Sequence, residues 1–222
     1  IAISNDNGHT WSQTSFADLF PGITEFDPIY AIESHNNRIY AAVLAFGIVY
    51  SEDGGMTWQL TDRESLLDPD DPDNGGQWCY NLRSFNGKLY NLGAFGIWEY
   101  DETDDVWSQV DPYWYAGDSI IVDDVLYVVY NAFGLEEGIR FTSDFQNWES
   151  MAIGDLSTSN RFLEYYNGAF FLGIVEEAIF YTLDHGNTWT EYREDFPMYS
   201  PAPGVEFYGT PMNLVFMEDT MY

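Results

Sequence analysis

The sequence predicts an all-β fold built from repeated four-stranded antiparallel units. Three observations lead to this prediction: a tryptophan recurs at a regular interval, polar hairpin turns recur in phase with it, and no run of apolar residues follows helical spacing. Aromatic residues make up 18% of the chain, a share that favours packed β-structure over helix. With 222 residues, the chain is long enough to bury a substantial core.

The repeating tryptophan ends a short polar segment that we call the box. The full box reads Ser/Thr-x-Asp-x-Gly-x-Thr-Trp and is found at residues 4–11, 51–58 and 182–189. Boxes that are one residue shorter and lack the glycine are found at 101–107 and 142–148. Successive box tryptophans are 41 to 49 residues apart, so the repeat covers the whole chain.

Two turns precede each box and divide its repeat into strands. The first is a polar hairpin turn such as Asn86-Gly87, in which both turn positions need a positive φ. The second carries the letters AFG at 45–47, 94–96 and 132–134. A third strand then leads to the box, and a fourth strand opens on the box tryptophan. Four-stranded units repeated radially are the blades of a β-propeller.

We therefore expect a single propeller or propeller fragment over residues 1–222. The expected parts are a half blade at 1–20, blades at about 26–60, 77–110, 115–150 and 158–193, and a half blade at 205–222. The two half blades could join into a fifth blade, or the chain could be part of a longer protein with more blades. The sequence leaves both arrangements open.

The box resembles the Asp box, or bacterial neuraminidase repeat, of sialidases, sortilin-type receptors, xyloglucanase-like glycosidases and many secreted bacterial proteins. This resemblance implies a β-propeller whose box turns lie between the third and fourth strands of each blade, on the face opposite the ligand site. It also implies a secreted or cell-surface location, and a structural role for the box residues. These are Asp6, Gly8, Trp11, Asp53, Gly55, Trp58, Trp107, Asp144, Trp148, Asp184, Gly186 and Trp189.

The box at 51–58 shows why such residues suit a turn. Asp53 can accept hydrogen bonds from the backbone of its own turn, and Gly55 can supply the positive φ that the turn demands. The hydroxyl groups of Ser51 and Thr57 can join the two strand ends. Trp58 is expected to bury a large apolar surface against the neighbouring sheet.

Charge limits the possible partners. The chain carries 37 acidic and 7 basic residues, a formal net charge of −30, which repels nucleic acids and anionic lipids and attracts cations or a basic partner. We therefore expect neither nucleic-acid binding nor direct membrane insertion. The single cysteine, Cys79, cannot form an internal disulfide bond, so it leaves the redox compartment open.

One face of the expected propeller carries the AFG turns and the loops between blades. Aromatic residues gather there beside carboxylates, which suits a protein or a glycan ligand. The candidate ligand-binding residues on this rim are Phe46, Phe95, Phe133, Tyr113, Trp114, Tyr115 and Arg161. The alternative is that each phenylalanine caps the core beneath its own turn.

An acidic loop is the candidate metal site. Asp68, Asp70, Asp71 and Asp73 concentrate carboxylate oxygens in a loop that ends in glycines, as a calcium ion would prefer. Pro72 interrupts the ligand spacing of an EF-hand, so a solvated acidic turn remains the alternative.

No catalytic residue can be assigned. A sialidase would need three arginines that converge on a carboxylate, and Arg38 and Arg140 are expected on the opposite face. Two carboxylates suffice for other glycosidases, but nothing singles out a pair among Asp27, Asp118, Glu176 and Glu177. The sequence favours a non-catalytic recognition or scaffold propeller that binds a protein or a glycan. The alternatives are a glycoside hydrolase on the same propeller and a purely structural repeat of a larger surface or secretion-related assembly.

Overall fold

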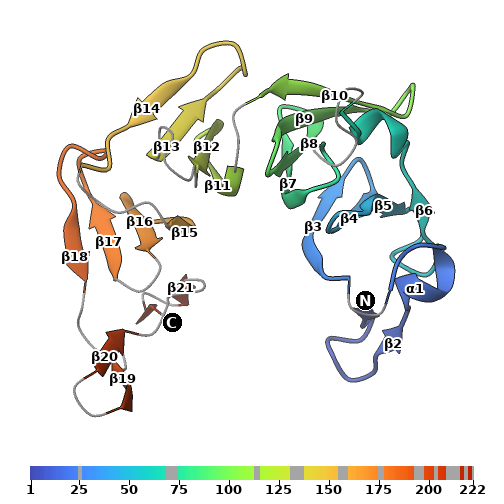
Figure 1. The fold of residues 1–222 in the computed structure, drawn as a ribbon, viewed down its shortest axis with the longest axis horizontal. Helices are drawn as coiled ribbons and strands as arrows, with labels where there is room; N and C mark the ends of the chain where they lie inside the picture. Colours follow the sequence, from blue (N-terminus) through green and yellow to red (C-terminus); the bar gives the residue numbers. More distant parts are fainter. Residues whose placement is uncertain are drawn as a thin grey trace. The chain divides into compact units, whose positions relative to one another are not determined.

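The computed structural model describes residues 1–24, 27–68, 75–112, 116–130, 138–154, 160–174, 178–192, 198–202, 205–208, 216–217 and 220–221. The chain divides into two compact units, Ile1–Tyr113 and Trp114–Tyr222. Both are built from antiparallel strands that pair in chain order (Figure 1). No helix in the described ranges is long and apolar enough to cross a membrane.

The first unit contains two four-stranded sheets. It begins with a hairpin of β1 (Ala2–Ile3) and β2 (Ser12–Gln13), followed by the short helix α1 (Phe16–Leu19). The first sheet consists of β3 (Ile29–His35), β4 (Arg38–Val43), β5 (Gly47–Ser51) and β6 (Gln59–Leu60). After the 3-10 turn η1 (Glu64–Leu66), the second sheet consists of β7 (Cys79–Phe85), β8 (Lys88–Gly93), β9 (Gly96–Asp101) and β10 (Val106–Asp111).

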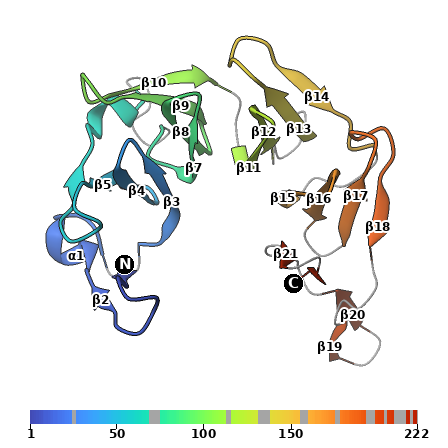
Figure 2. The same cartoon turned by 180° about the vertical axis from the view of Figure 1, so that it is seen from behind.

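The second unit repeats this plan. Its first sheet consists of β11 (Ala116–Val122), β12 (Val125–Tyr130), β13 (Gly138–Thr142) and β14 (Glu149–Met151). The next consists of β15 (Asn160–Tyr166), β16 (Ala169–Ile174), β17 (Ile179–Thr182) and β18 (Thr190–Tyr192). Two hairpins follow, β19 (Met198–Ala202) with β20 (Val205–Tyr208), and β21 (Phe216–Met217) with β22 (Thr220–Met221), as Figure 2 shows for β19, β20 and β21.

Each four-stranded sheet opens with the same two-residue hairpin. Both turn residues have positive φ in every case, as at Asn36 (46°) and Asn37 (63°), or Asn86 (49°) and Gly87 (74°). This is the turn whose twist matches that of the strands it joins. The first strand of each sheet also shifts register at its start, for example between Ile29 and Ala31. The four sheets therefore share one backbone plan.

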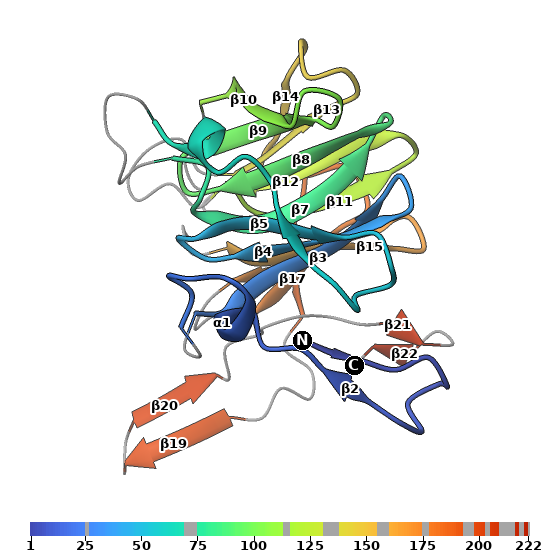
Figure 3. The ribbon, with the colours of Figure 1, turned by 90° about the vertical axis from the view of Figure 1, so that its right-hand side faces the viewer.

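Both faces of the first sheet are buried, because successive side chains of a strand point to opposite faces. Tyr40 and Ala42 pack with Leu82, Trp98 and other residues of the second sheet. On the opposite face, Ala41 and Val43 join a cluster that includes residues of α1. In Figure 3, β3–β5 accordingly lie between β7–β9 and α1.

The second unit has a corresponding core between its two sheets. Tyr127, Val129 and Ile139 of the first sheet pack against Leu163 and Phe170 of the next. Burial of such side chains contributes about 1.5–3 kcal/mol each. Contact between whole sheet faces is therefore the main stabilisation within each unit.

The structure adds elements that the sequence pattern does not indicate. The helices α1 and η1 have four and three residues, too few to show helical periodicity. The hairpin of β19 and β20 follows the last four-stranded sheet, and its second strand falls within the segment 205–222 expected as a half blade.

Candidate functional site

The box at 51–58 satisfies its own polar groups. The Asp53 carboxylate accepts hydrogen bonds from the Thr57 backbone N–H (2.8 Å) and hydroxyl (2.6 Å), while the Ser51 Oγ accepts from the Gly55 N–H at 2.7 Å. Chiefly because of the Thr57 side chain, the pKa of Asp53 is lowered to about 2. The Trp58 Nε1–H donates to the carbonyl of Gly55 at 2.9 Å. All these bonds lie within the turn.

The full boxes at 4–11 and 182–189 form the same carboxylate bonds. Asp6 accepts from Thr10, and Asp184 accepts from Thr188. Hydrogen bonding lowers the pKa of both aspartates. These carboxylates are therefore occupied by their own turns.

Two tryptophans of full boxes contact residues that precede them by about one repeat. Trp58 meets Phe16 of α1 edge to face at 5.0 Å, so its partner is this helix rather than a neighbouring sheet. The Trp189 Nε1–H donates to the carbonyl of Ala152 at 2.8 Å, just after β14. Trp11 is 64% exposed.

The shortened box at 101–107 connects the two sheets of the first unit. The Trp107 Nε1–H donates to the Thr61 hydroxyl at 3.1 Å, and the Trp107 N–H donates to the Ser65 hydroxyl at 2.8 Å. The Asp105 carboxylate accepts from the backbone N–H of Asp62 at 3.0 Å. The box and the segment after β6 therefore form one rigid arrangement.

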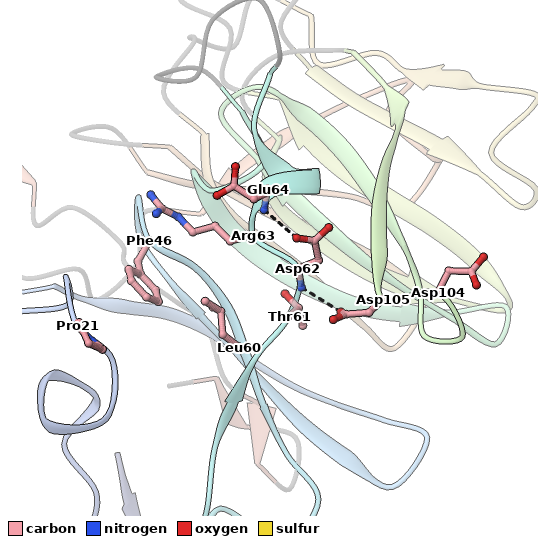
Figure 4. Close-up of a pocket in the computed structure, with 9 residues that line it drawn as sticks. All are labelled: Pro21, Phe46, Leu60, Thr61, Asp62, Arg63, Glu64, Asp104 and Asp105. Atoms are coloured by element: carbon pink, nitrogen blue, oxygen red, sulfur yellow. Dashed lines mark hydrogen bonds between the residues drawn. The ribbon is translucent and has the colours of Figure 1, made fainter.

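A pocket of about 630 Å³ opens beside this arrangement, within the first unit (Figure 4). Its walls come from the turn between β4 and β5, the segment from β6 to η1, the shortened box, and the loop after α1. The residues that line it are Pro21, Phe46, Leu60, Thr61, Asp62, Arg63, Glu64, Asp104 and Asp105. The pocket combines an aromatic ring, an arginine and several carboxylates.

Glycines bring the pocket wall together. Ala45, with φ of 58°, turns the chain between β4 and β5 and places Phe46 in the wall. Gly47 has φ of 143°, and the Arg63 stem lies so close that an added Cβ would be 3.6 Å from the Arg63 Cγ. Gly22 similarly lies against the Phe46 ring. A Cβ at either glycine would meet its neighbour at ordinary van der Waals distance, so the positive φ is the reason for glycine at both positions.

Arg63 lies at one end of the pocket. Its guanidinium lies 5.4 Å from the centre of the Phe46 ring, and its Nε is buried without a hydrogen-bond partner. It forms no ion pair with any residue that the structure describes. In contrast, Arg38, Arg83 and Lys88 each pair with a glutamate.

Carboxylates lie along the rest of the pocket. Asp62 follows Thr61, whose hydroxyl is fixed by its bond to the carbonyl of Ile48 (2.9 Å). Asp105 uses one carboxylate oxygen, Oδ1, to accept from the Asp62 N–H and from the Tyr100 hydroxyl (2.6 Å). The pKa of Tyr100 is raised by burial and by this hydrogen bond. Figure 4 shows Asp104 and Asp105 at the opposite end from Arg63 and Phe46.

The pocket includes one residue of the expected aromatic rim. Phe46 is half-buried and contacts Phe20 at 6.2 Å as well as Arg63. Phe95 is also half-buried, but it does not line this pocket. Phe133, Tyr113, Trp114 and Tyr115 lie outside the described residues, as does the side chain of Arg161.

The expected calcium loop lies mostly outside the described part of the chain. Of its four aspartates only Asp68 is described, and Asp70, Asp71 and Asp73 are not. Within the described ranges, no group of three or more His, Cys, Asp or Glu side chains is placed to hold a metal ion. The calcium site remains a prediction.

Sequence reasoning did not single out Arg63, Asp62, Asp104 or Asp105. Arg63 belongs to no motif, and it reaches Phe46 only because β5 and β6 return the chain past the turn between β4 and β5. The only sequence signal is an arginine directly after the fourth strand of a repeat in a chain with few basic residues.

Comparison with known proteins shows the fold alone. No family model matches the sequence, and no curated protein matches it. The structure is similar to the extracellular domain of a hybrid two-component system from B. thetaiotaomicron, with a TM-score of 0.59 and 10% identity. That alignment covers 83% of this chain and 23% of the other.

Two structures of YCF48 are also similar. YCF48 bound to D1 peptide has a TM-score of 0.57 and 17% identity, over 98% of this chain and 65% of the other. YCF48 from Cyanidioschyzon merolae has a TM-score of 0.53 and 12% identity, over 78% of this chain and 59% of the other. The chain thus spans less than two thirds of each of these proteins. They are β-propeller-like, and so is the fold described here.

Proposed function

We propose that the chain is a non-catalytic recognition module: an Asp-box propeller, secreted or on the cell surface, that binds an extended segment of another protein. The observation that carries the proposal is the pocket beside Phe46. It places an aromatic ring, an arginine without a carboxylate partner among the described residues, and carboxylates in one open hollow of about 630 Å³.

The chemistry of the pocket favours binding to a polypeptide. Interface hot spots are enriched in aromatic and arginine side chains, surrounded by polar groups that fix the orientation of the partner. The pocket wall is also preorganised, because Thr61 and Asp62 are fixed by hydrogen bonds to β5 and the shortened box. A fixed wall lowers the entropy cost of binding.

The structural comparisons support the same kind of function. One similar structure is an extracellular domain, and another is YCF48 bound to a peptide. For this chain, the Asp box, the extracellular location and the protein partner are parts of our proposal.

The test is selection from a random peptide library displayed on phage, with the whole chain as bait. Selected peptides are then synthesised, and their Kd values are measured for the wild type and for Phe46→Ser. We expect Phe46→Ser to weaken binding by about fivefold or more, because a hot-spot side chain contributes over about 1 kcal/mol. Unfolding midpoints check that the variant remains folded.

Met56→Ser is the matched control. Met56 is 70% exposed and lies in the box at 51–58, outside the pocket, so its truncation should leave peptide binding unchanged. Phe95→Ser then shows whether the surface extends along the rim beyond the pocket. A library that gives no binding peptide, or equal loss with Phe46→Ser and Met56→Ser, would contradict the proposed function.

A further inference from the structure

In the pocket beside Phe46, the basic side chain lies at one end with Glu64 next to it, and two carboxylates lie at the other end. Arg63 lies over the Phe46 ring at one end, and Asp104 and Asp105 lie at the other (Figure 4). Both ends belong to the first unit. We infer that the pocket recognises a mixed-charge peptide segment: a carboxylate beside an apolar side chain at the Arg63 end, and a lysine or arginine at the Asp104–Asp105 end. This inference rests on the proposed function.

The Arg63 end fits a carboxylate. A guanidinium presents donors in a planar fork that matches the two oxygens of a carboxylate. Arg63 contacts an aromatic ring instead of an acidic side chain, and its Nε has no hydrogen-bond partner. A peptide carboxylate in the pocket would accept from the terminal nitrogens of this guanidinium.

The surroundings of Arg63 are the reason to expect an apolar side chain in the peptide, next to its carboxylate. Phe46, Leu60 and Pro21 line the same end of the pocket. The Phe46 ring is half-buried, so part of it remains exposed to water. An aliphatic or aromatic side chain next to the peptide carboxylate would cover this surface, which is favourable in proportion to the apolar area removed from water.

The opposite end fits a basic side chain. Asp105 uses Oδ1 for the Asp62 N–H and the Tyr100 hydroxyl, and its Oδ2 has no hydrogen bond within the described residues. The exposed Asp104 side chain adds a second carboxylate. A cationic group at this end would form a charge-assisted hydrogen bond with the Asp105 Oδ2 or with the Asp104 carboxylate.

The net charge of the chain argues for a mixed-charge peptide over an acidic one. At −30, the chain repels a partner that carries several carboxylates, because like charges slow association and oppose binding. A basic residue beside the acidic one removes this penalty. It also fixes the direction in which the peptide lies, since reversal would place like charges together at both ends.

The experiment is a double-mutant cycle with a peptide selected from the phage library. The peptide is synthesised with its acidic residue as Glu and as Gln, and both forms are measured against the wild type and Arg63→Gln. We expect either single change to weaken binding about tenfold, the loss typical of one charge-assisted pair. The double change should cost little more than either single change, because both remove the same contact.

A second cycle tests the other end. It combines Asp104→Asn with replacement of the basic peptide residue by Gln. Asp104 is chosen because its side chain is exposed and its carboxylate forms no hydrogen bond within the described residues, so the variant should fold like the wild type. We again expect the double change to weaken peptide binding little more than either single change does.

Arg140→Gln is the matched control for Arg63→Gln. Arg140 is also half-buried and lies over aromatic rings, those of Tyr130 and Trp148, but it belongs to the second unit. The Arg140→Gln variant should therefore bind the peptide as tightly as the wild type does. Arg63→Lys keeps the charge without the planar fork and should retain only part of the affinity.

The outcomes separate the two proposals. If no peptide is selected, the proposed function fails, and this inference fails with it. If peptides bind and need Phe46, but lack an acidic residue or lose affinity additively with Arg63→Gln, the recognition function stands and the inference is overturned. A peptide that binds equally well with its sequence reversed would likewise overturn the assigned direction.

Discussion

The boxes at 51–58 and 101–107 belong to the same unit and to successive repeats, yet they do different things. In the full box, Asp53 binds Thr57 and the Trp58 indole binds the carbonyl of Gly55, so the turn is complete in itself. In the shortened box, the Trp107 indole and the Asp105 carboxylate bind Thr61 and Asp62, which follow the previous sheet.

The loss of one residue does not explain this difference by itself, because the box at 142–148 is equally short and its Asp144 still accepts from Gln146 and Asn147 of its own turn. Without the glycine, the left-handed position of the shortened box is taken by Asp105, with φ of 53°. Its carboxylate then points to the neighbouring segment instead of its own turn, and it becomes part of the pocket wall. The full box stabilises a hairpin, whereas the shortened box joins two sheets and helps to form the candidate site.

The box tryptophans give the largest expected effect. Trp107 is 2% exposed and stacks on Tyr100 at 4.6 Å, so Trp107→Ala should lower the free energy of unfolding by about 3–5 kcal/mol. Trp58→Ala should cost nearly as much, because Trp58 is 8% exposed. Trp11 is 64% exposed, so Trp11→Ala should change the free energy of unfolding by less than about 0.5 kcal/mol. Urea denaturation measures all three, and equal midpoints for Trp107→Ala and Trp11→Ala would contradict the packing described here.

The box glycines should come next. Gly186 has φ of 86°, and a Cβ there would lie 2.7 Å from the carbonyl oxygen of Ala152. Gly186→Ala therefore adds overpacking, about 1–3 kcal/mol, to the cost of a left-handed residue, about 1–2 kcal/mol. Gly54→Ala is the control. Gly54 has φ of 73°, and a Cβ there would have nothing within 4 Å, so this variant should show the cost of a left-handed residue alone. Thermal unfolding that ranks Gly54→Ala as the worse variant would refute this explanation.

Two threonines distinguish an internal contact from a connecting one: Thr57 lies within the full box, and Thr61 follows β6 and binds the shortened box. Thr61 is buried, donates to the carbonyl of Ile48 and accepts from the Trp107 indole. Thr61→Val leaves the Trp107 indole N–H without its partner, while the Ile48 carbonyl keeps the Thr61 backbone N–H. We expect a loss of about 1–3 kcal/mol in the free energy of unfolding. Thr57→Val removes an exposed hydroxyl and should cost less. A larger loss for Thr57→Val in urea denaturation would show that the full box matters more than the shortened one.

The smallest expected effect is a dependence of stability on pH. Hydrogen bonding lowers the pKa of Asp53 to about 2 from an ordinary value of 3.8. A group whose pKa is lower in the folded state stabilises the protein above its unfolded pKa, and this contribution is lost as the pH falls through the folded value. The difference in urea midpoint between wild type and Asp53→Asn should therefore be present at neutral pH, shrink below about pH 4 and vanish near pH 2. A difference that persists at pH 2 would show that the carboxylate charge is not its cause.

The repeated features of the fold could be predicted from sequence, and the single features could not. The polar hairpins and recurring tryptophans indicate four-stranded antiparallel sheets because each feature depends on residues close together in the chain. Arg63 lies 17 positions after Phe46, and their contact depends on how β5 and β6 return the chain past the turn. Asp105 could not be identified either, because its partner Asp62 lies in the previous repeat.

The packing of box tryptophans on preceding residues has a consequence for synthesis on the ribosome. Trp107 binds Thr61, and Trp189 binds Ala152, so each donor emerges 46 or 37 residues after its acceptor. At about 5–20 residues per second, this delay is roughly 2–9 s. During that interval the completed sheet has one face without its indole cover. The nascent chain should therefore gain resistance to protease in steps. Each step should follow the emergence of the tryptophan that covers a sheet completed earlier.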